Sequence, residues 1–236
     1  MNNLISVFVP VYNEEKILKE TVRKITEELK KIGDNFEIFI IDDASNDNTP
    51  QLANELSQEN PYVKYRKFTK GPSRRENLAM SFNQARGDIV LFMDVDLSTD
   101  LSHLKQLIDE IKKGADIAIG SRYMKIYPQR KFTRKIISNL YNSFLRLIFK
   151  SKIKDHQCGF KAFKKEVIDK LVKEMGYDET FNRGWFWDAE TLIRAQRQQL
   201  KIKEFAVRWH RGEKSSFNFF REIKIIPFIL KLKKKL

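Results

Sequence analysis

Cysteine and histidine are scarce in this sequence of 236 residues. Its one cysteine, Cys158, excludes an internal disulfide framework and a zinc site built from several cysteines. With three histidines, a histidine-rich metal site is not expected either. The shortage of cysteine also favours a reducing environment.

Long hydrophobic runs are missing too. No stretch approaches the roughly 20 apolar residues that a membrane-spanning helix needs. The longest late run, residues 225–230, is far too short, and Pro10 interrupts the first apolar run, which has no basic start. We therefore expect a protein without a signal peptide, cytoplasmic and either soluble or peripheral on the cytoplasmic face of a membrane.

Positive charge is abundant. Lys and Arg number 45 against 31 Asp and Glu, which gives a formal net charge of +14, while 42% of the residues are hydrophobic. The apolar content suffices for a buried core. The charge predicts an acidic partner: nucleic acid, anionic lipid or a phosphorylated small molecule. The sign alone does not choose among these three.

Short apolar runs alternate with helical patterns over the first 120 residues. We expect strands at residues 4–11, 36–41, 62–68, 88–93 and 116–119, and helices at 15–32, 49–58, 74–85 and 101–112. This order predicts an α/β fold with a mostly parallel central sheet and helices on both faces. Ligands of such sheets bind at the carboxyl ends of the strands.

The second half is less regular. Helices are expected at 132–149, 164–174 and 187–199, and strands within 155–163 and 203–209. No repeat or linker is apparent, so we expect one domain spanning residues 1–236. Its last part, about 215–236, mixes Phe and Ile with Lys and predicts a basic amphipathic segment. This segment either packs on the domain or lies on an anionic membrane.

Acidic side chains follow two of the predicted strands. Asp94 and Asp96 come after the run Ile89–Met93, and strand alternation directs both to the same side. Two such carboxylates can hold one hard divalent cation and leave positions open for phosphate oxygens. Asp42 and Asp43 end another strand. They are equally compatible with a structural turn and with hydrogen bonding to a nucleobase or ribose.

The motifs around these residues resemble the family 2 inverting glycosyltransferases, which have the GT-A (Rossmann-like) fold. The similarity is greatest to the dolichyl- and polyprenyl-phosphate mannose and glucose synthases. It rests on motifs in family order over about residues 4–215: Val9–Glu15, Asp42–Thr49, Ala85–Asp88, Met93–Leu97, Gly120–Tyr123, Arg134–Ser138, Asp155–Lys161 and Arg211–Lys214.

The resemblance implies roles for individual residues. A nucleotide pocket would be lined by Pro10, Tyr12, Glu14 and Asp43. Mg²⁺ or Mn²⁺ on the donor diphosphate would be bound by Asp94 and Asp96. The acceptor's phosphate would be held by Arg122, Arg134 and Ser138, and the donor diphosphate would be covered by Arg211 and Lys214.

The implied reaction moves a hexose from a UDP- or GDP-sugar to dolichyl or polyprenyl phosphate, with inversion. The nucleophile is an ionised phosphate, so no strong general base is needed. The residues after Asp96, together with Gln157–Lys161, favour glucose over mannose. The histidines His156 and His210 are expected to be structural, and Cys158 to be a buried filler.

Other functions stay open at this point. A glycan or polysaccharide hydroxyl acceptor would need a base, for which Asp188 and Glu190 are candidates, although both could instead cap and solvate a helix. A nucleotidyltransferase would share the sheet and the paired Asp residues. A nucleic-acid-binding protein would explain the charge, but no helix-turn-helix, zinc-finger or RNP motif is apparent, so nucleic acid is not an expected partner.

Overall fold

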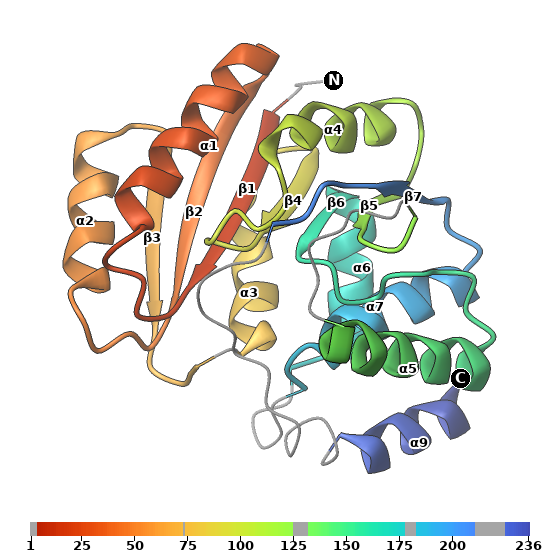
Figure 1. Ribbon diagram of the computed structural model, residues 1–236. Coiled ribbons are helices and arrows are strands. Elements are labelled where there is room, and N and C mark those ends of the chain that lie inside the picture. The colour runs from red at the N-terminus through yellow and green to blue at the C-terminus, as the bar shows by residue number, and fades with distance from the viewer. Residues whose placement is uncertain (1–3, 73, 125–131, 178–182, 211–224) are drawn as a thin grey trace.

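The computed structural model describes residues 4–72, 74–124, 132–177, 183–210 and 225–236, without the side chains of 132–137. A seven-stranded sheet in the order β3-β2-β1-β4-β6-β5-β7 forms its centre (Figure 1). The strands are β1 (Leu4–Val11), β2 (Asn35–Asp43), β3 (Val63–Phe68), β4 (Ile89–Met93), β5 (Ile117–Ser121), β6 (Phe160–Lys164) and β7 (Ile202–Ala206).

Helices connect the strands. They are α1 (Leu18–Ile32), α2 (Thr49–Glu59), α3 (Arg75–Ser81), α4 (Leu104–Lys112), α5 (Phe132–Phe149), α6 (Lys165–Met175), α7 (Phe186–Arg197) and α9 (Ile226–Lys235), with short 3₁₀ turns at Phe82–Gln84 and Leu101–His103. No helix in the described ranges has both the length and the hydrophobicity required to cross a membrane.

Strand direction confirms the expected mostly parallel sheet. Among the seven strands of the described ranges, β6 alone runs antiparallel to its neighbours, and it lies between β4 and β5. Chain order does not predict this insertion. The physical reason is that β6 has buried apolar side chains on both faces and so fits the sheet interior.

Helices cover both faces of the sheet, as predicted. In β1, Val7 and Val9 join the core formed with α1, α2 and α4, whereas Phe8 joins the core formed with α3, α6 and α7. The Phe8 ring stacks on Phe39 of β2 at a centroid distance of 4.6 Å. Successive side chains of a pleated strand point to opposite faces of the sheet, so β1 contributes to both cores.

The predicted boundaries need small corrections. The expected helix 15–32 begins at Leu18, because the preceding residues form a turn in which Ile17 N donates to Glu14 O at 3.1 Å. It ends at Gly33, whose φ of 85° lets its N–H reach Leu29 O. The expected helix 74–85 is a two-turn helix, α3, followed by a 3₁₀ turn.

A third, smaller core joins α5, α7 and α9, which lie together at one end of the molecule (Figure 1). Ile229 and Leu232 of α9 are buried in it with Leu145 and Phe149 of α5. Residues 225–236 of the predicted amphipathic segment therefore pack on the fold. The other part of that segment, and the prediction of one domain over 1–236, are not tested by the structure.

Candidate active site

The loops after β1 and β2 are tied together by side chains. Asn13 N donates to Ser45 Oγ at 2.9 Å, and Asn46 N donates to Asn13 Oδ1 at 2.9 Å. Glu14 N donates to Thr49 Oγ1 at 2.8 Å, at the start of α2. Since Pro10 and Tyr12 lie on and just beyond the end of β1, the residues predicted for the nucleotide pocket share one rim of the sheet.

The two Asp residues at the end of β2 have different surroundings. Asp42 is fully buried, and its carboxylate accepts from Ser45 N at 2.8 Å and from Tyr65 OH at 3.0 Å. It is therefore a structural residue of the turn.

Asp43 faces α3 instead. Its carboxylate accepts from Asn77 Nδ2 at 2.9 Å and from Arg74 N at 3.2 Å. Burial raises its pKa to about 6, although these hydrogen bonds oppose the shift. Gly71 packs against the backbone here, and a Cβ at Gly71 would lie 1.8 Å from Asp43 O. Asp43 is 6% exposed, and its contact with a nucleotide stays a prediction.

Asp94 and Asp96 follow β4 as predicted, with Val95 buried between them. Asp94 N donates to Gly159 O at 3.2 Å, and the Asp94 carboxyl packs onto Gly159, where an added Cβ would lie 2.1 Å from Asp94 Oδ2. Asp96 is exposed, and its Oδ1 accepts from Ser98 N at 2.9 Å. Both carboxylates are accessible at the carboxyl end of the sheet.

This pair fits a divalent cation that is shared with a substrate. Carboxylate oxygens are the ligands that Mg²⁺ and Mn²⁺ prefer, and the glycine cradle fixes one of them. Within the described ranges, no group of three or more His, Cys, Asp or Glu side chains could hold a metal ion. The remaining ligands would therefore come from a phosphorylated substrate and water.

Two cations and a third carboxylate lie beside Asp94. Arg75 of α3 places Nη2 3.5 Å from Asp94 Oδ1 and Nε 3.1 Å from Asp188 Oδ2. Lys161 of β6 places Nζ 2.9 Å from Asp188 Oδ1. The side chain of Asp94 is 43% exposed to solvent. Its pKa is nevertheless raised, by burial at the base of the site and by Asp96 and Asp188, while Arg75 opposes the shift.

Arg75 and Lys161 were not among the predicted site residues. Lys161 carried a detectable signal, because it is a lysine at the centre of the short apolar strand Phe-Lys-Ala-Phe, and a buried lysine requires an acidic partner. Arg75 carried no such signal, because a basic residue at a helix start is ordinarily solvated. The sequence-based alternative that Asp188 is a solvated capping residue is wrong, since only 1% of it is exposed.

Arg122 forms a two-point ion pair with Asp155. Its Nε donates to Asp155 Oδ2 and its Nη2 to Asp155 Oδ1, both at 2.7 Å, and Asp155 is fully buried. The guanidinium therefore braces the turn after β5 against residues 154–156. Direct contact of Arg122 with an acceptor phosphate stays a prediction.

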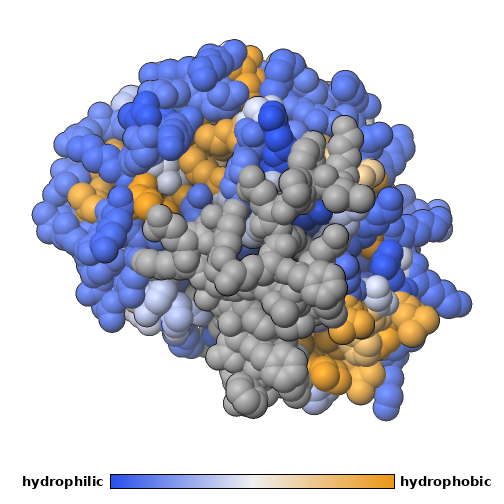
Figure 2. Space-filling view, viewed as in Figure 1, coloured by the Kyte–Doolittle hydropathy of each residue, from blue (hydrophilic) through white to orange (hydrophobic). Residues whose placement is uncertain are grey.

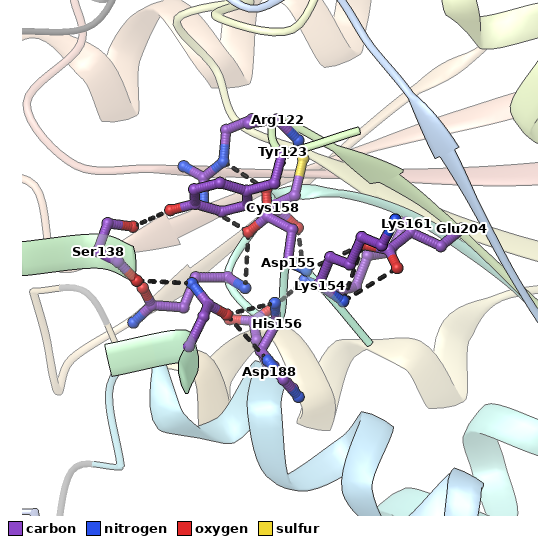
Figure 3. A network of polar contacts seen from close by, with 12 residues as sticks. Arg122, Tyr123, Ser138, Lys154, Asp155, His156, Cys158, Lys161, Asp188 and Glu204 are labelled. Atoms are coloured by element: carbon purple, nitrogen blue, oxygen red, sulfur yellow. Dashed lines mark hydrogen bonds and ion pairs between the residues drawn. The ribbon is translucent and has the colours of Figure 1, made fainter. Parts of the chain in front are cut away.

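Ser138 lies on α5 and hydrogen-bonds to Tyr123, toward which its side chain points (Figure 3). The network continues through Asn142, whose Oδ1 accepts from the Nδ1 and N of buried His156. Burial lowers the pKa of His156 to about 4, so it is neutral and structural. Cys158 is likewise buried, and burial raises its pKa to about 12.

The side chains of three predicted site residues lie outside the described part of the structure. Arg134 lies in the first turn of α5, but its side chain is outside the described part of the structure. Arg211 and Lys214 lie in residues 211–224, which are also outside it. Their predicted contacts with phosphate are therefore untested. The helix α5 does bring the Arg134 position within one turn of Ser138.

Known proteins are similar to this chain in sequence. The chain is 35% identical over 223 residues to glycosyltransferase AglD of Haloferax volcanii, covering 93% of the chain and 35% of that protein. It is 33% identical to the dolichyl-phosphate beta-glucosyltransferase of Saccharomyces cerevisiae, covering 87% of the chain and 66% of the relative. The chain thus spans between a third and two thirds of these relatives.

The fold is also that of a solved enzyme. Glucosyl-3-phosphoglycerate synthase from Mycobacterium tuberculosis, crystallised with Mn²⁺, UDP and phosphoglyceric acid, superposes with a TM-score of 0.66 at 17% identity, over 98% of this chain and 77% of that one. This likeness shows a GT-A fold. The model of the family described as glycosyl transferase family 2 matches residues 6–172. The chain belongs to glycosyl transferase family 2.

Proposed function

We propose that this protein transfers a hexose, glucose or mannose, from a UDP- or GDP-sugar to the phosphate of dolichyl or another polyprenyl phosphate. Mg²⁺ or Mn²⁺ held by Asp94 and Asp96 would neutralise charge on the donor diphosphate as it leaves. The name of the yeast relative and the Mn²⁺ and UDP in the mycobacterial structure support this assignment.

One observation favours a phosphate acceptor over a hydroxyl acceptor. A hydroxyl nucleophile must give up a proton to a base within hydrogen-bond reach. Asp188 is the carboxylate nearest to Asp94 on α7, but it is 1% exposed and its two oxygens accept from Lys161 and Arg75. Glu190 is also 1% exposed and is paired with Arg183 and Arg194. A phosphate monoester needs no such base, because it is already ionised near pH 7.

The other predicted site residues would bind the nucleotide and the diphosphate of the donor. Pro10, Tyr12 and Glu14 would line the nucleotide pocket, and Asp43 would accept from a base N–H or a ribose hydroxyl. Arg211 and Lys214 would cover the diphosphate. A single displacement then inverts the anomeric carbon, with the acceptor oxygen approaching from the side opposite the leaving diphosphate.

Acceptor binding is assigned to the end of α5 that carries Ser138. Ser138 and Arg134 would hold the acceptor phosphate, since a guanidinium binds two phosphate oxygens at once. Arg122 is a further candidate. Its pairing with Asp155 fixes the turn that carries Tyr123, the hydrogen-bond partner of Ser138, so it would also position the acceptor site.

A lipid acceptor has to be met at a membrane, and one face of the molecule suits that surface. Leu140 and Leu147 of α5 are 65% and 81% exposed, and Leu230 of α9 is 49% exposed. Figure 2 shows a hydrophobic patch at the lower right, where Figure 1 places α5 and α9. Residues 132–154 and 225–236 contain no Asp or Glu, and α9 ends in Lys233–Lys235.

Apolar side chains surrounded by lysines fit an anionic bilayer. We therefore place the protein peripherally on the cytoplasmic face of a membrane, with this face of α5 and α9 against the lipid. Nucleic acid is not a proposed partner, because the protein's positive charge is the one feature that favours nucleic-acid binding.

A radiolabel transfer assay tests the proposal. UDP- and GDP-hexoses are incubated with polyprenyl phosphate and Mg²⁺ or Mn²⁺, with Asp96→Ala as the inactive control and Asp109→Ala as a surface control. Label in the lipid phase, lost in Asp96→Ala alone, is the expected result. Transfer to a glycan hydroxyl, or release of pyrophosphate as by a nucleotidyltransferase, would contradict it.

A further inference from the structure

Arg75 lies among three carboxylates at the carboxyl end of the sheet. It contacts Asp94 and Asp188, and it also interacts electrostatically with Asp43. Its side chain is 11% exposed, and its guanidinium lies 5.5 Å from the centre of the Phe92 ring. No other arginine in the described part of the chain makes an ion pair with Asp94.

The two ends of this guanidinium are held unequally. Nε is 3.1 Å from a carboxylate that is 1% exposed, which is a charge-assisted hydrogen bond in protein surroundings. Nη2 is 3.5 Å from Asp94, whose side chain is 43% exposed, so this contact is longer and more screened. The hydrogen bond from Arg75 to Asp188 can therefore persist while the contact between Arg75 and Asp94 is broken and replaced by another.

The exchanging contact uses a carboxylate that we assign to the metal. A divalent ion on Asp94 and a guanidinium 3.5 Å from the same carboxylate repel one another, because both are positively charged and lie close to one group. The two cations thus cannot both use Asp94 fully. Whichever binds, the other loses part of its interaction.

We propose that Arg75 and the divalent ion compete for Asp94, and that Arg75, displaced from Asp94 but still anchored on Asp188, binds a phosphate oxygen of the donor nucleoside diphosphate. This inference rests on the proposed function, because it assumes a metal on Asp94 and Asp96. It assigns Arg75 as a donor-binding residue.

The charge count agrees with this exchange. Asp94, Asp96, Asp188 and Asp43 are four carboxylates, and Arg75 and Lys161 are two cations. The cluster is therefore formally negative before a metal binds, and it attracts a cation. One divalent ion balances the formal charge and removes the repulsion of the diphosphate, so metal and nucleotide binding should be coupled.

Direct binding measurements on the full chain test the inference. Mn²⁺ is titrated into the unmodified protein and Arg75→Gln without nucleotide, with free Mn²⁺ followed by electron paramagnetic resonance. UDP and GDP are then titrated in saturating Mn²⁺. We expect Arg75→Gln to bind Mn²⁺ about fivefold more tightly and the preferred nucleotide about tenfold more weakly, in line with one to two kcal/mol per lost charge contact.

Opposite changes in the two affinities are the signature, because a merely structural defect weakens both. Arg66→Gln is the matched control, since Arg66 of β3 donates to Met80 O and makes no ion pair with Asp94. If Arg75→Gln fails to fold in a thermal unfolding scan, Arg75→Lys replaces it. A lysine keeps the charge but lacks the planar fork that lets one nitrogen stay on Asp188 while another reaches the phosphate, so nucleotide affinity should still fall about threefold or more.

Unchanged or weaker Mn²⁺ binding by a folded Arg75→Gln would overturn this inference and leave the proposed function standing. Failure of the unmodified protein to bind Mn²⁺ at all would overturn the metal site of the proposed function, and this inference with it.

Discussion

Lys161 Nζ lies 2.9 Å from Asp188 Oδ1, and each side chain is 1% exposed. Lys161 also donates to Cys158 O at 2.5 Å, and its ammonium lies 5.2 Å from the centre of the Phe92 ring. A strand from the sheet centre and the first turn of α7 are thereby joined under the candidate metal site. Each partner satisfies a charge that would otherwise be buried alone.

Removing one member of this pair should destabilise the protein severely. In Lys161→Met, the buried Asp188 loses one of its two cationic partners and keeps the ion pair with Arg75. We expect a loss of about 3 kcal/mol or more in the free energy of unfolding. Urea unfolding measures it. In a double-mutant cycle with Asp188→Asn, the second change should restore part of the loss. Additive losses would show that the pair does not interact.

Gly159 should be essential for the metal site. The Cβ of Gly159→Ala would lie 2.1 Å from Asp94 Oδ2, so the carboxylate has to leave its position. We expect Mn²⁺ affinity to fall about tenfold or more, equivalent to losing one ligand. Gly120→Ala, where the added Cβ would meet the side chain of Val207 at 2.9 Å, is the control for overpacking. Normal Mn²⁺ binding by Gly159→Ala would remove Asp94 from the site.

Asp43 should make stability depend on pH. Its pKa is about 6 in the folded state, raised by burial above an ordinary value near 4. The folded state therefore holds the proton more tightly, so this contribution is present below about pH 4 and is lost as pH rises through about 6. The loss is of the order of 2–3 kcal/mol.

Asp43→Asn should remove that dependence. Chemical unfolding of the variant and the unmodified protein between pH 4 and 7, with Asp109→Asn as a surface control, measures it. The difference in unfolding free energy between Asp43→Asn and the unmodified protein should grow as pH rises. A difference constant with pH would show that Asp43 titrates normally.

The exposed face of α5 and α9 should bind anionic vesicles. Leu147→Ser and Leu230→Ser each remove apolar area from it, and each should weaken binding to phosphatidylglycerol-containing vesicles about threefold to tenfold. Co-sedimentation measures the affinity. Tyr62→Ser, at a side chain 40% exposed beside the start of β3, should have no effect. Equal weakening by all three variants would exclude a specific membrane face.

Much of the fold was predictable because apolar runs and helical periodicity are local. The alternation over the first 120 residues predicts the strands β1 to β5. Strand alternation does not extend to Asp94 and Asp96, because β4 ends at Met93 and Leu97 N donates to Asp94 O at 3.2 Å in the turn that follows. The position of β6 was not predictable, since its neighbours β4 and β5 are chosen by shape and burial across the whole sheet rather than by local pattern.

The candidate site shows the same division. Motifs single out Asp43, Asp94 and Ser138 as candidates, because each motif is a short local string, and their roles stay predictions. The pairing of Arg75 and Lys161 with Asp188 joins residues 113 and 27 positions apart, and only the tertiary structure brings them together. The pairing of Arg122 with Asp155 likewise depends on β5 and the chain before β6 meeting at one edge.

The most direct test of the account compares two acceptors that differ by one group. The protein is given the nucleotide-hexose that labels lipid best, with Mn²⁺ and either a polyprenyl phosphate or the same polyprenol without phosphate. The enclosed Asp188 predicts transfer to the phosphate and at least a hundredfold less to the alcohol, because no base is available to a hydroxyl. Equal transfer to the two acceptors would contradict it.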